Sequence, residues 1–247
     1  MTNPANAVGS PSIAQGDYWW YRARAELLQA ALEPYVGTPR RLLDVGSADG
    51  PSVSWLRGRA EQHVSLDIDP RGLEPGGVCG SALQLPFADG VFDVVAAFDV
   101  IEHCEPESKA LAEVARVLAP GGRLLMSVPA YEWAWSNHDD WNQHHRRYTR
   151  KRAVAAVSAA GLEVQRATYA FAGTFPMFAV SRLGERIKER GKPTPKLPDG
   201  AVPPLPEVSP VLERVLLGAS GLDRRLLRRH NLPFGSSVVI AAVRSAR

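Results

Sequence analysis

The segment LLDVGSADGP, residues 42–51, decides the fold of this chain. The apolar residues at its start extend a run over 40–45 (RRLLDV) that predicts a buried strand. Small residues follow as a turn, and Pro51 stands where a proline opens a helix, because the first helical N–H groups lack intrahelical partners. A strand that passes through a small-residue turn into a helix is typical of nucleotide-binding α/β proteins.

Strands and helices alternate on both sides of this segment. Helices are expected over 17–36, 105–118 and 149–160, and the short linker 70–77 predicts a short or missing crossover helix. Because continuous apolar strands alternate with helices, we expect a mostly parallel sheet covered on both faces. Further strands are predicted at HVSLDI (63–68), VCGSA (78–82), FDVVAAF (92–98), RLLMSV (123–128), LEVQRATYA (162–170) and SSVVIAAV (236–243).

The expected domain organisation has three parts. Residues 1–16 are predicted to be a flexible leader, and 17–170 together with 236–247 to form one α/β domain. Residues 171–235 are predicted to be a helical and irregular insertion before the last strand, with a proline-rich linker over 193–210.

Two basic stretches of the insertion have helical patterns, over 176–190 and 210–229. Gly218 and Gly221 are expected to interrupt the second of them, because glycine disfavours a helix interior.

Composition excludes several classes of protein. With 247 residues, 45% apolar and 22% charged, the chain has the composition of a globular protein, not of a disordered chain or a disulfide scaffold. Its two cysteines, Cys79 and Cys104, form no CxxC pair and indicate a reducing compartment. The N-terminus has no secretory pattern, and the apolar stretch 169–180 is too short to span a bilayer, so we expect a cytoplasmic protein.

The net charge of +3 is unevenly distributed, with an acidic excess before residue 136 and a basic excess after it. An acidic first half favours a cationic ligand. No recognition helix or aromatic-rich strand accompanies the basic half, so we expect no nucleic-acid partner.

The turn at 46–50 fits a cationic cofactor better than a dinucleotide. Asp49 would repel a pyrophosphate, and Pro51 removes one of the N–H donors that a pyrophosphate needs. S-adenosyl-L-methionine carries positive groups that tolerate Asp44 and Asp49 nearby. Asp67, at the end of the next strand, can accept both ribose hydroxyls. Taken alone, the turn also fits a plain strand–helix connection.

In combination, these segments resemble the class I S-adenosyl-L-methionine-dependent methyltransferases, in the branch of quinone and small-molecule methylases. The resemblance implies a Rossmann-like seven-stranded sheet, mostly parallel, with an antiparallel last strand. It covers about residues 20–170 and the last strand, and is carried by LLDVGSADG (42–50), SLDIDP (65–70), GSALQLPFADGVFDVV (80–95), FDVIEH (98–103) and ARVLAPGGRLLMSVP (115–129).

The resemblance also implies a set of cofactor residues. Two departures from the family pattern stand out: Ala48 replaces a glycine, and Ser81 replaces an aspartate that accepts from the adenine amine. The implied cofactor-binding residues are Asp44, Gly46, Ser47, Gly50, Asp67, Ile68, Ser81, Ala82, Phe98 and Asp99.

The loop after the fifth strand is expected to face the methyl acceptor. His138 or His144 is the predicted general base for a hydroxyl acceptor, with Asp139 as a partner, although the loop could also be purely structural. No metal site is predicted, because no HExxH-type spacing occurs. Glu102 and His103 also match a family pattern and are secondary candidates. The predicted acceptor-binding residues are Trp19, Trp20, Arg24, Tyr131, Trp135, Arg146, Arg147 and Tyr148.

The predicted function is methyl transfer to a small-molecule, glycan or lipid-linked acceptor, with O-methylation favoured. Two alternatives remain open, a non-catalytic cofactor-binding module and a nicotinamide-dependent oxidoreductase on a similar sheet. Residues 211–234 mix leucines with arginines, which suits either a cap over the acceptor pocket or a peripheral contact with the inner face of a membrane.

Overall fold

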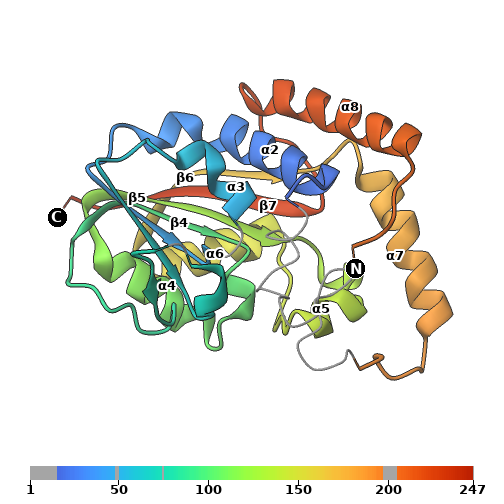
Figure 1. Cartoon of the computed structure of the whole chain (residues 1–247), viewed down its shortest axis with the longest axis horizontal. Coiled ribbons are helices and arrows are strands. Elements are labelled where there is room, and N and C mark those ends of the chain that lie inside the picture. Colours follow the sequence, from blue (N-terminus) through green and yellow to red (C-terminus); the bar gives the residue numbers. More distant parts are fainter. Residues whose placement is uncertain (1–15, 48–49, 74, 197–204, 247) are drawn as a thin grey trace.

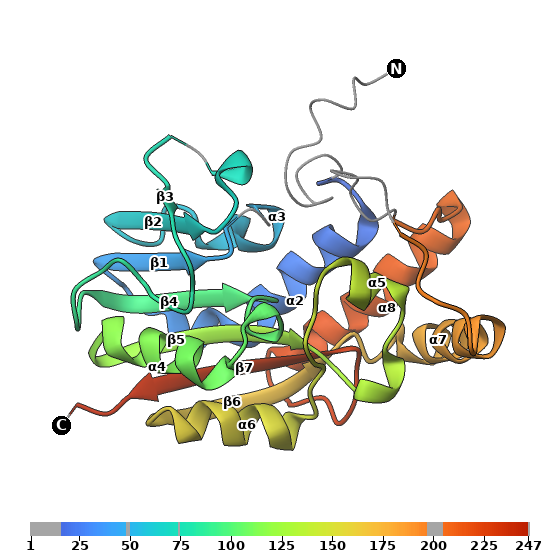
Figure 2. The ribbon, with the colours of Figure 1, turned by 90° about the horizontal axis from the view of Figure 1, so that it is seen from below.

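The computed structural model describes residues 16–47, 50–73, 75–196 and 205–246, and a seven-stranded sheet lies at its centre (Figure 1). The order of strands across the sheet is β3-β2-β1-β4-β5-β7-β6 (Figure 2). Their bounds are β1 Arg41–Val45, β2 Gln62–Asp67, β3 Val78–Cys79, β4 Phe92–Phe98, β5 Leu118–Pro129, β6 Leu162–Ala170 and β7 Ser237–Arg244.

Strand directions confirm the predicted fold class. β1 pairs in parallel with both β2 and β4, and β4 pairs in parallel with β5. β7 runs antiparallel to both of its neighbours, β5 and β6. The chain crosses outward on both sides of β1, so the carboxyl ends of β1 and β4 border the position where such sheets bind ligands.

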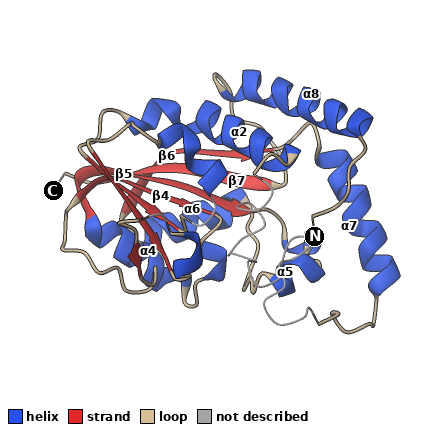
Figure 3. Ribbon diagram, in the orientation of Figure 1, coloured by secondary structure: helices blue, strands red, loops and turns tan. Residues whose placement is uncertain are grey.

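Helices cover both faces of the sheet (Figure 3). α2 lies on one face with α8 packed on its outer side, and α4 and α6 lie on the other (Figure 1). Of the strands between these layers, β1, β4 and β7 are buried over most of their lengths, as expected for a sheet covered on both sides. The helix bounds are α2 Trp19–Val36, α3 Gly50–Val53, α4 Glu107–Val117, α5 Asn137–Trp141, α6 Arg150–Ala159, α7 Phe175–Glu189 and α8 Pro210–Leu227.

Two connections differ from a regular crossover. Among the described residues between β2 and β3, the only regular element is the 3-10 turn η3, Pro70–Gly72, which agrees with the short crossover predicted there. β3 is shorter than the predicted 78–82, because Ser81 already bonds within a turn to Gln84. β5 begins earlier than predicted, at Leu118, and an irregularity in its pairing with β4 accommodates the Pro-Gly-Gly turn.

The insertion between β6 and β7 contains two helices. The prediction that Gly218 and Gly221 interrupt the second was wrong, since α8 is continuous through both. Each glycine costs a helix interior about 1 kcal/mol, and burial of Leu216 and Leu227 offsets that cost. In the described parts of the proline-rich segment, residues 193–196 and 205–209 have no regular secondary structure, and Pro210 begins α8. Four further predictions fall outside the described residues: those on 1–15, Ala48, Asp49 and 197–204.

One side chain joins the layers of this fold. The Arg166 guanidinium, on β6, donates hydrogen bonds to the carbonyl of Ala31 in α2 at 2.7 Å and to that of Leu227 in α8 at 2.6 Å. It also donates to the His230 carbonyl and to the Asn231 side chain. A single cation thus binds carbonyl groups near the C-terminal end of α8 and fixes both helices to the sheet edge.

We expect Arg166→Ala to lower the free energy of unfolding by about 2–4 kcal/mol, because several partly buried carbonyls lose a charged donor. Urea denaturation followed by circular dichroism measures this loss. Arg228→Ala is the matched control, because Arg228 is exposed on the same layer and its change should stay within about 0.5 kcal/mol. Equal stabilities for the two variants would contradict the role given to Arg166.

Candidate active site

The first part of the site is the turn that leaves β1. Gly46 has a φ of +76°, and a Cβ placed on it would lie 2.4 Å from a methyl group of Val100, so only glycine fits. Its N–H donates to the Leu66 carbonyl at 2.8 Å, which ties the turn to β2. Gly50, on the far side of the turn, begins α3.

Two polar side chains lie at this turn. Asp44 is almost fully buried at the end of β1. The Ser47 hydroxyl is buried and has no hydrogen-bond partner among the described residues. A buried hydroxyl without a partner is costly, so it indicates a place where a ligand atom can complete the set of hydrogen bonds.

The second part lies at the ends of β2 and β3. Asp67 is buried, and one of its carboxylate oxygens accepts from the Asp69 N–H at 2.8 Å, which fixes the side chain. The next residue, Ile68, exposes 74% of its surface, an unusual position for a large apolar side chain. Ser81 and Ala82 follow β3, and the Ser81 hydroxyl accepts from the Leu83 N–H at 3.2 Å.

The third part is the end of β4, where Phe98 is buried and Asp99 has a φ of +55°. Non-glycine residues in this left-handed region are rare and often lie at functional sites. The Asp99 carboxylate accepts from the Ser127 hydroxyl at 2.9 Å and forms an ion pair with Arg24 at 3.1 Å. Arg24, predicted to bind the acceptor, is therefore buried next to the end of β4.

These three strand ends meet at one edge of the sheet, and their chemistry fits S-adenosyl-L-methionine. Asp44, Asp67 and Asp99 supply negative charge beside a positively charged ligand. Gly46 has no side chain, so its backbone can lie close to a ligand. The Ser47 hydroxyl offers that ligand a polar contact, and the exposed Ile68 side chain offers it an apolar one.

Asp139 organises the loop between β5 and α6, residues 130–149, which is called the acceptor-side loop after its predicted role. Its carboxylate is fully buried, binds the Arg147 guanidinium through both oxygens at 2.8 and 3.0 Å, and accepts from the Ser136 N–H at 2.9 Å. Nδ1 of His144 lies 2.8 Å from Oδ1 of Asp139. Burial raises the pKa of Asp139, but the His144 hydrogen bond and the Arg147 charge outweigh it and hold this pKa below its ordinary value. Asp139 is therefore an ionised acceptor, so Nδ1 of His144 donates to it and Nε2 is the ring nitrogen that this carboxylate does not engage.

His138 lies on α5, one residue before Asp139, and is half-buried. Burial and the nearby charge of Arg182 lower the pKa of His138 to about 4. The imidazole is therefore neutral at physiological pH, which is the state that a proton acceptor requires.

Glu102 and His103 form part of the 3-10 turn η4, Ile101–His103, directly after β4. Glu102 is fully buried, and burial together with the Asp99 charge raises its pKa well above the ordinary value. The Glu102 carbonyl accepts from the His145 N–H at 2.9 Å, which brings the acceptor-side loop against η4. The position of Glu102 and His103 directly after β4 is the sequence signal that favours them as site residues.

Aromatic side chains border the acceptor side. Trp20 stacks on Phe171 with ring centroids 6.0 Å apart, and Arg24 lies over the Trp20 ring. Tyr131 stacks on Tyr169 at 5.4 Å.

Two further predicted tryptophans have different surroundings. Trp19 is half-buried, and its indole N–H has no partner among the described residues. Trp135 donates from its indole N–H to the Asp140 carboxylate at 2.9 Å.

Besides Arg24 and Trp135, three more of the predicted acceptor-binding residues bind groups of the protein. Arg146 is buried, donates to the Cys104 carbonyl at 2.7 Å and forms an ion pair with Glu105. Tyr148 is buried and bonds to Glu107 through its hydroxyl. Arg147 binds Asp139, as described above. Arg147 is therefore directed into the loop itself, whereas Arg146 and Tyr148 tie the loop to the segment 104–107.

Comparison with known proteins identifies relatives of the chain. The methyltransferase domain family matches residues 43–126, which include the turn after β1 and most of β5. An uncharacterized methyltransferase of Mycobacterium sp. (strain KMS) is 32% identical over 180 residues, which cover 62% of this chain and 71% of that protein. A demethylmenaquinone methyltransferase of Mycolicibacterium vanbaalenii is 36% identical over 132 residues, covering 51% of this chain and 53% of that protein.

Solved structures share the fold at lower identity. The geranyl diphosphate C-methyltransferase from Streptomyces coelicolor A3(2), solved with S-adenosyl-L-homocysteine, superposes with a TM-score of 0.55 at 15% identity, covering 90% of this chain and 78% of that one. The phosphoethanolamine N-methyltransferase 2 of Haemonchus contortus, solved with S-adenosyl-L-methionine, gives 0.53 at 15%, covering 88% and 52%. The match to the methyltransferase of Mycobacterium sp. (strain KMS) covers 71% of that protein at 32% identity, which a shared fold alone does not explain. The chain therefore belongs to the class I methyltransferases, with S-adenosyl-L-methionine as its cofactor.

Proposed function

We propose that this methyltransferase acts on a hydroxyl group of a small-molecule or lipid-linked acceptor. The observation that carries the proposal is the acceptor-side loop, in which the ionised Asp139 holds Nδ1 of His144 and the neutral imidazole of His138 lies nearby. Proton removal is needed for a hydroxyl acceptor, whereas an activated carbon or an amine makes a weaker demand on a base.

We further propose how the chain holds its cofactor. Asp67 binds the ribose hydroxyls and Ile68 packs on the adenine, while Ser81 and Ala82 contact its edge. Gly46, Ser47 and Gly50 contact the amino-acid part, with Asp44 near its ammonium group, and Phe98 and Asp99 border the methyl group. The buried Ser47 hydroxyl without a partner and the exposed Ile68 support this assignment.

The proposed reaction is an in-line displacement. S-adenosyl-L-methionine supplies a methyl carbon activated by its sulfonium. A lone pair of the acceptor oxygen forms the O–C bond while the C–S bond breaks, and its electron pair stays on sulfur, so that neutral S-adenosyl-L-homocysteine leaves. The acceptor proton passes to the Nε2 of His138 or His144. The protein contributes mainly alignment and this proton acceptor.

The segment 171–235 is proposed to cap the acceptor pocket. Phe175 of α7 contacts Tyr131, with ring centroids 5.5 Å apart, and the Asn137 side chain donates to Glu189 at 2.7 Å. Trp141 donates to the Pro195 carbonyl at 2.7 Å. The insertion therefore lies against the acceptor-side loop, and its aromatic contacts favour an acceptor with an apolar or aromatic body.

Within this proposal, the predicted acceptor-binding residues have two kinds of task. Trp19, Trp20, Arg24, Tyr131 and Trp135 border the acceptor. Arg146, Arg147 and Tyr148 position the loop, because each is buried on a partner within the protein. The name of one relative, demethylmenaquinone methyltransferase, is consistent with a quinone-sized acceptor.

Asp67→Ala is expected to weaken binding of S-adenosyl-L-methionine by about 1.5–3 kcal/mol, the scale of hydrogen bonds to a charged group. Isothermal titration calorimetry measures the change. Asp69→Ala is the matched control, since that carboxylate, two residues away, binds Arg71 instead. Unchanged affinity in Asp67→Ala would exclude the ribose assignment.

Loss of the proton acceptor should lower turnover by about 10²–10⁴-fold while cofactor binding stays intact. His138→Ala and His144→Ala are each compared with the wild type in single-turnover methyl transfer to hydroxyl acceptors, with calorimetry to confirm that the cofactor binds. His230→Ala controls for loss of an exposed imidazole elsewhere. If both loop variants keep wild-type turnover, neither imidazole is the base.

We also propose that α7 rests on an anionic membrane surface when the acceptor is lipid-linked. No helix in the part of the chain that the structure describes is long and apolar enough to cross a bilayer. α7 has no buried residue, and it exposes Val180 and Ile187 by 72% and 79%. Arg186 and Lys188 lie beside them, a combination that suits the headgroup region of a membrane.

Vesicle sedimentation tests this membrane contact. Binding should rise with the fraction of anionic lipid and fall with salt, because each basic residue near the surface contributes about 1 kcal/mol. Arg186→Glu should weaken binding, whereas Arg40→Glu, at an exposed residue directly before β1 and outside α7, should leave it unchanged. Absence of binding to anionic vesicles at low salt would leave α7 only its role as a cap.

A further inference from the structure

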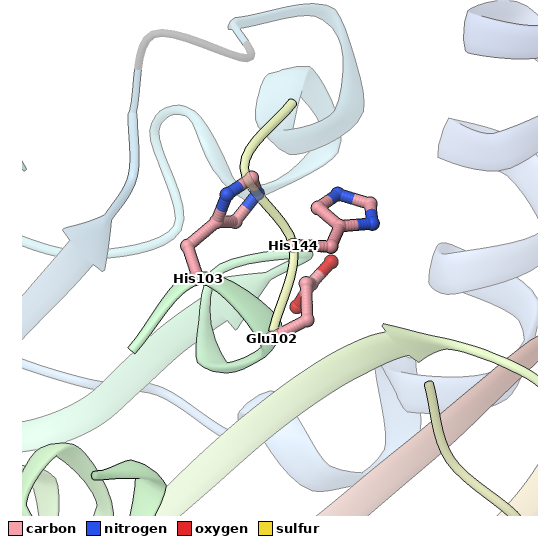
Figure 4. A group of neighbouring side chains, drawn as sticks. All are labelled: Glu102, His103 and His144. Carbon is pink, nitrogen blue, oxygen red and sulfur yellow. The ribbon is translucent and has the colours of Figure 1, made fainter. Parts of the chain in front are cut away.

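Three side chains that can bind metals meet beside the end of β4. Glu102 and His103 come from η4, and His144 comes from the loop after α5. One ligand atom from each lies within 4.8 Å of the others. Figure 4 shows the two imidazoles side by side with the Glu102 carboxylate next to the His144 ring, and the ring centroids are 4.6 Å apart.

The Glu102 carboxyl group is the least satisfied member of this cluster. It has no solvent exposure, and neither of its oxygens has a hydrogen-bond partner from another residue in the described chain. A buried carboxyl group in this state is costly, and native proteins retain one where a proton, an ion or a ligand completes its bonds.

Both imidazoles are oriented by their other nitrogen. Nδ1 of His144 donates to the Asp139 carboxylate at 2.8 Å, and the His103 ring donates to the backbone carbonyl of Asn142. Histidines that bind a metal almost always donate their second N–H to a carboxylate or a carbonyl, because this fixes the tautomer and the ring. Each ring therefore keeps one lone pair for a ligand.

We propose that Glu102, His103 and His144 bind one divalent transition-metal ion, of which Zn²⁺ is the example tested below. Two imidazoles and one carboxylate are a donor set that suits Zn²⁺, Mn²⁺ or Fe²⁺, whereas Mg²⁺ and Ca²⁺ prefer oxygen ligands alone. Three protein ligands leave open positions, as in metal sites that bind a substrate.

The spacing of the cluster is compatible with such an ion. Ligand atoms about 2.1 Å from a common metal lie about 3–3.4 Å from one another. The three atoms here lie within 4.8 Å of one another, and η4 and the loop are already joined by the bond from His145 N–H to the Glu102 carbonyl, so a small closure of the cluster suffices.

This inference rests on the proposed function in one respect: the proposed function identifies an acceptor oxygen as the group that would fill the open coordination position of the ion. Because η4 follows β4 directly, the ion would lie near Phe98 and Asp99, where the methyl group is proposed to be. A metal ion there would hold the acceptor oxygen and lower its pKa, as divalent ions do for bound water. The Nε2 lone pair of His144 would then be occupied, which leaves His138 as the proton acceptor.

Titration with Co²⁺ alone tests the site, because its visible d–d absorption reports imidazole ligands without any methyl transfer. The metal-free wild-type protein should bind one Co²⁺ per chain in the micromolar range or tighter, and Zn²⁺ should displace it. Glu102→Gln, His103→Ala and His144→Ala should each weaken binding at least about 100-fold, more than loss of an outer partner usually does. The control His230→Ala should bind as the wild type does.

Glu102→Gln also serves as a control for misfolding, because glutamine keeps the shape of the side chain. The melting temperature of this variant should match or exceed that of the wild type. Millimolar affinity in the wild type, or wild-type affinity in all three ligand variants, would overturn the metal site. Chelation should lower turnover of hydroxyl acceptors, and full activity after verified metal removal would overturn the role given to the ion. If Co²⁺ binds as expected but no hydroxyl acceptor is methylated, the proposed acceptor class fails and the metal site stands.

Discussion

The acceptor side of this enzyme depends on the burial of a single negative charge, that of Asp139. A carboxylate without access to water is stable only when fixed partners neutralise it. Arg147, His144 and the Ser136 backbone supply these partners, so three separate parts of the loop must converge on one point. The orientation of His144, and with it the arrangement of the neighbouring cluster, follows from this requirement.

The regular part of the fold could be predicted from the sequence because its strands are buried on both faces. The bounds of β4 and β6 match the predicted 92–98 and 162–170, where continuous apolar or alternating runs end at clear turn signals. Local sequence signals predicted the structure less well where tertiary packing determines it. The glycines of α8 were predicted to break the helix, yet the contact of α8 with α2 keeps it continuous.

The candidate site likewise has a part that could be predicted from the sequence and a part that could not. The turn at Gly46 and the carboxylate of Asp67 were predictable because local spacing along β1 and β2 places them. The meeting of Glu102 and His103 with His144 was not, because it depends on how a loop distant in sequence folds onto η4. The internal partners of Arg146 and Tyr148 could not be predicted for the same reason. The sequence identifies the type of a polar loop residue but does not show whether its side chain bonds to the protein or faces a ligand.

The pairing of β6 with β7 has a consequence for how acceptor specificity can change. Ala170 and Ser237 face each other as partners in the ladder, so the chain leaves the sheet and returns to it at adjacent positions. A segment with neighbouring ends adds little strain to its host when it is lengthened, shortened or exchanged, since the closure of a loop costs entropy only slowly with length. On the proposal that this segment caps the acceptor, its length and sequence can therefore change while the strands stay the same, provided that α8 keeps its contacts with α2 and with Arg166.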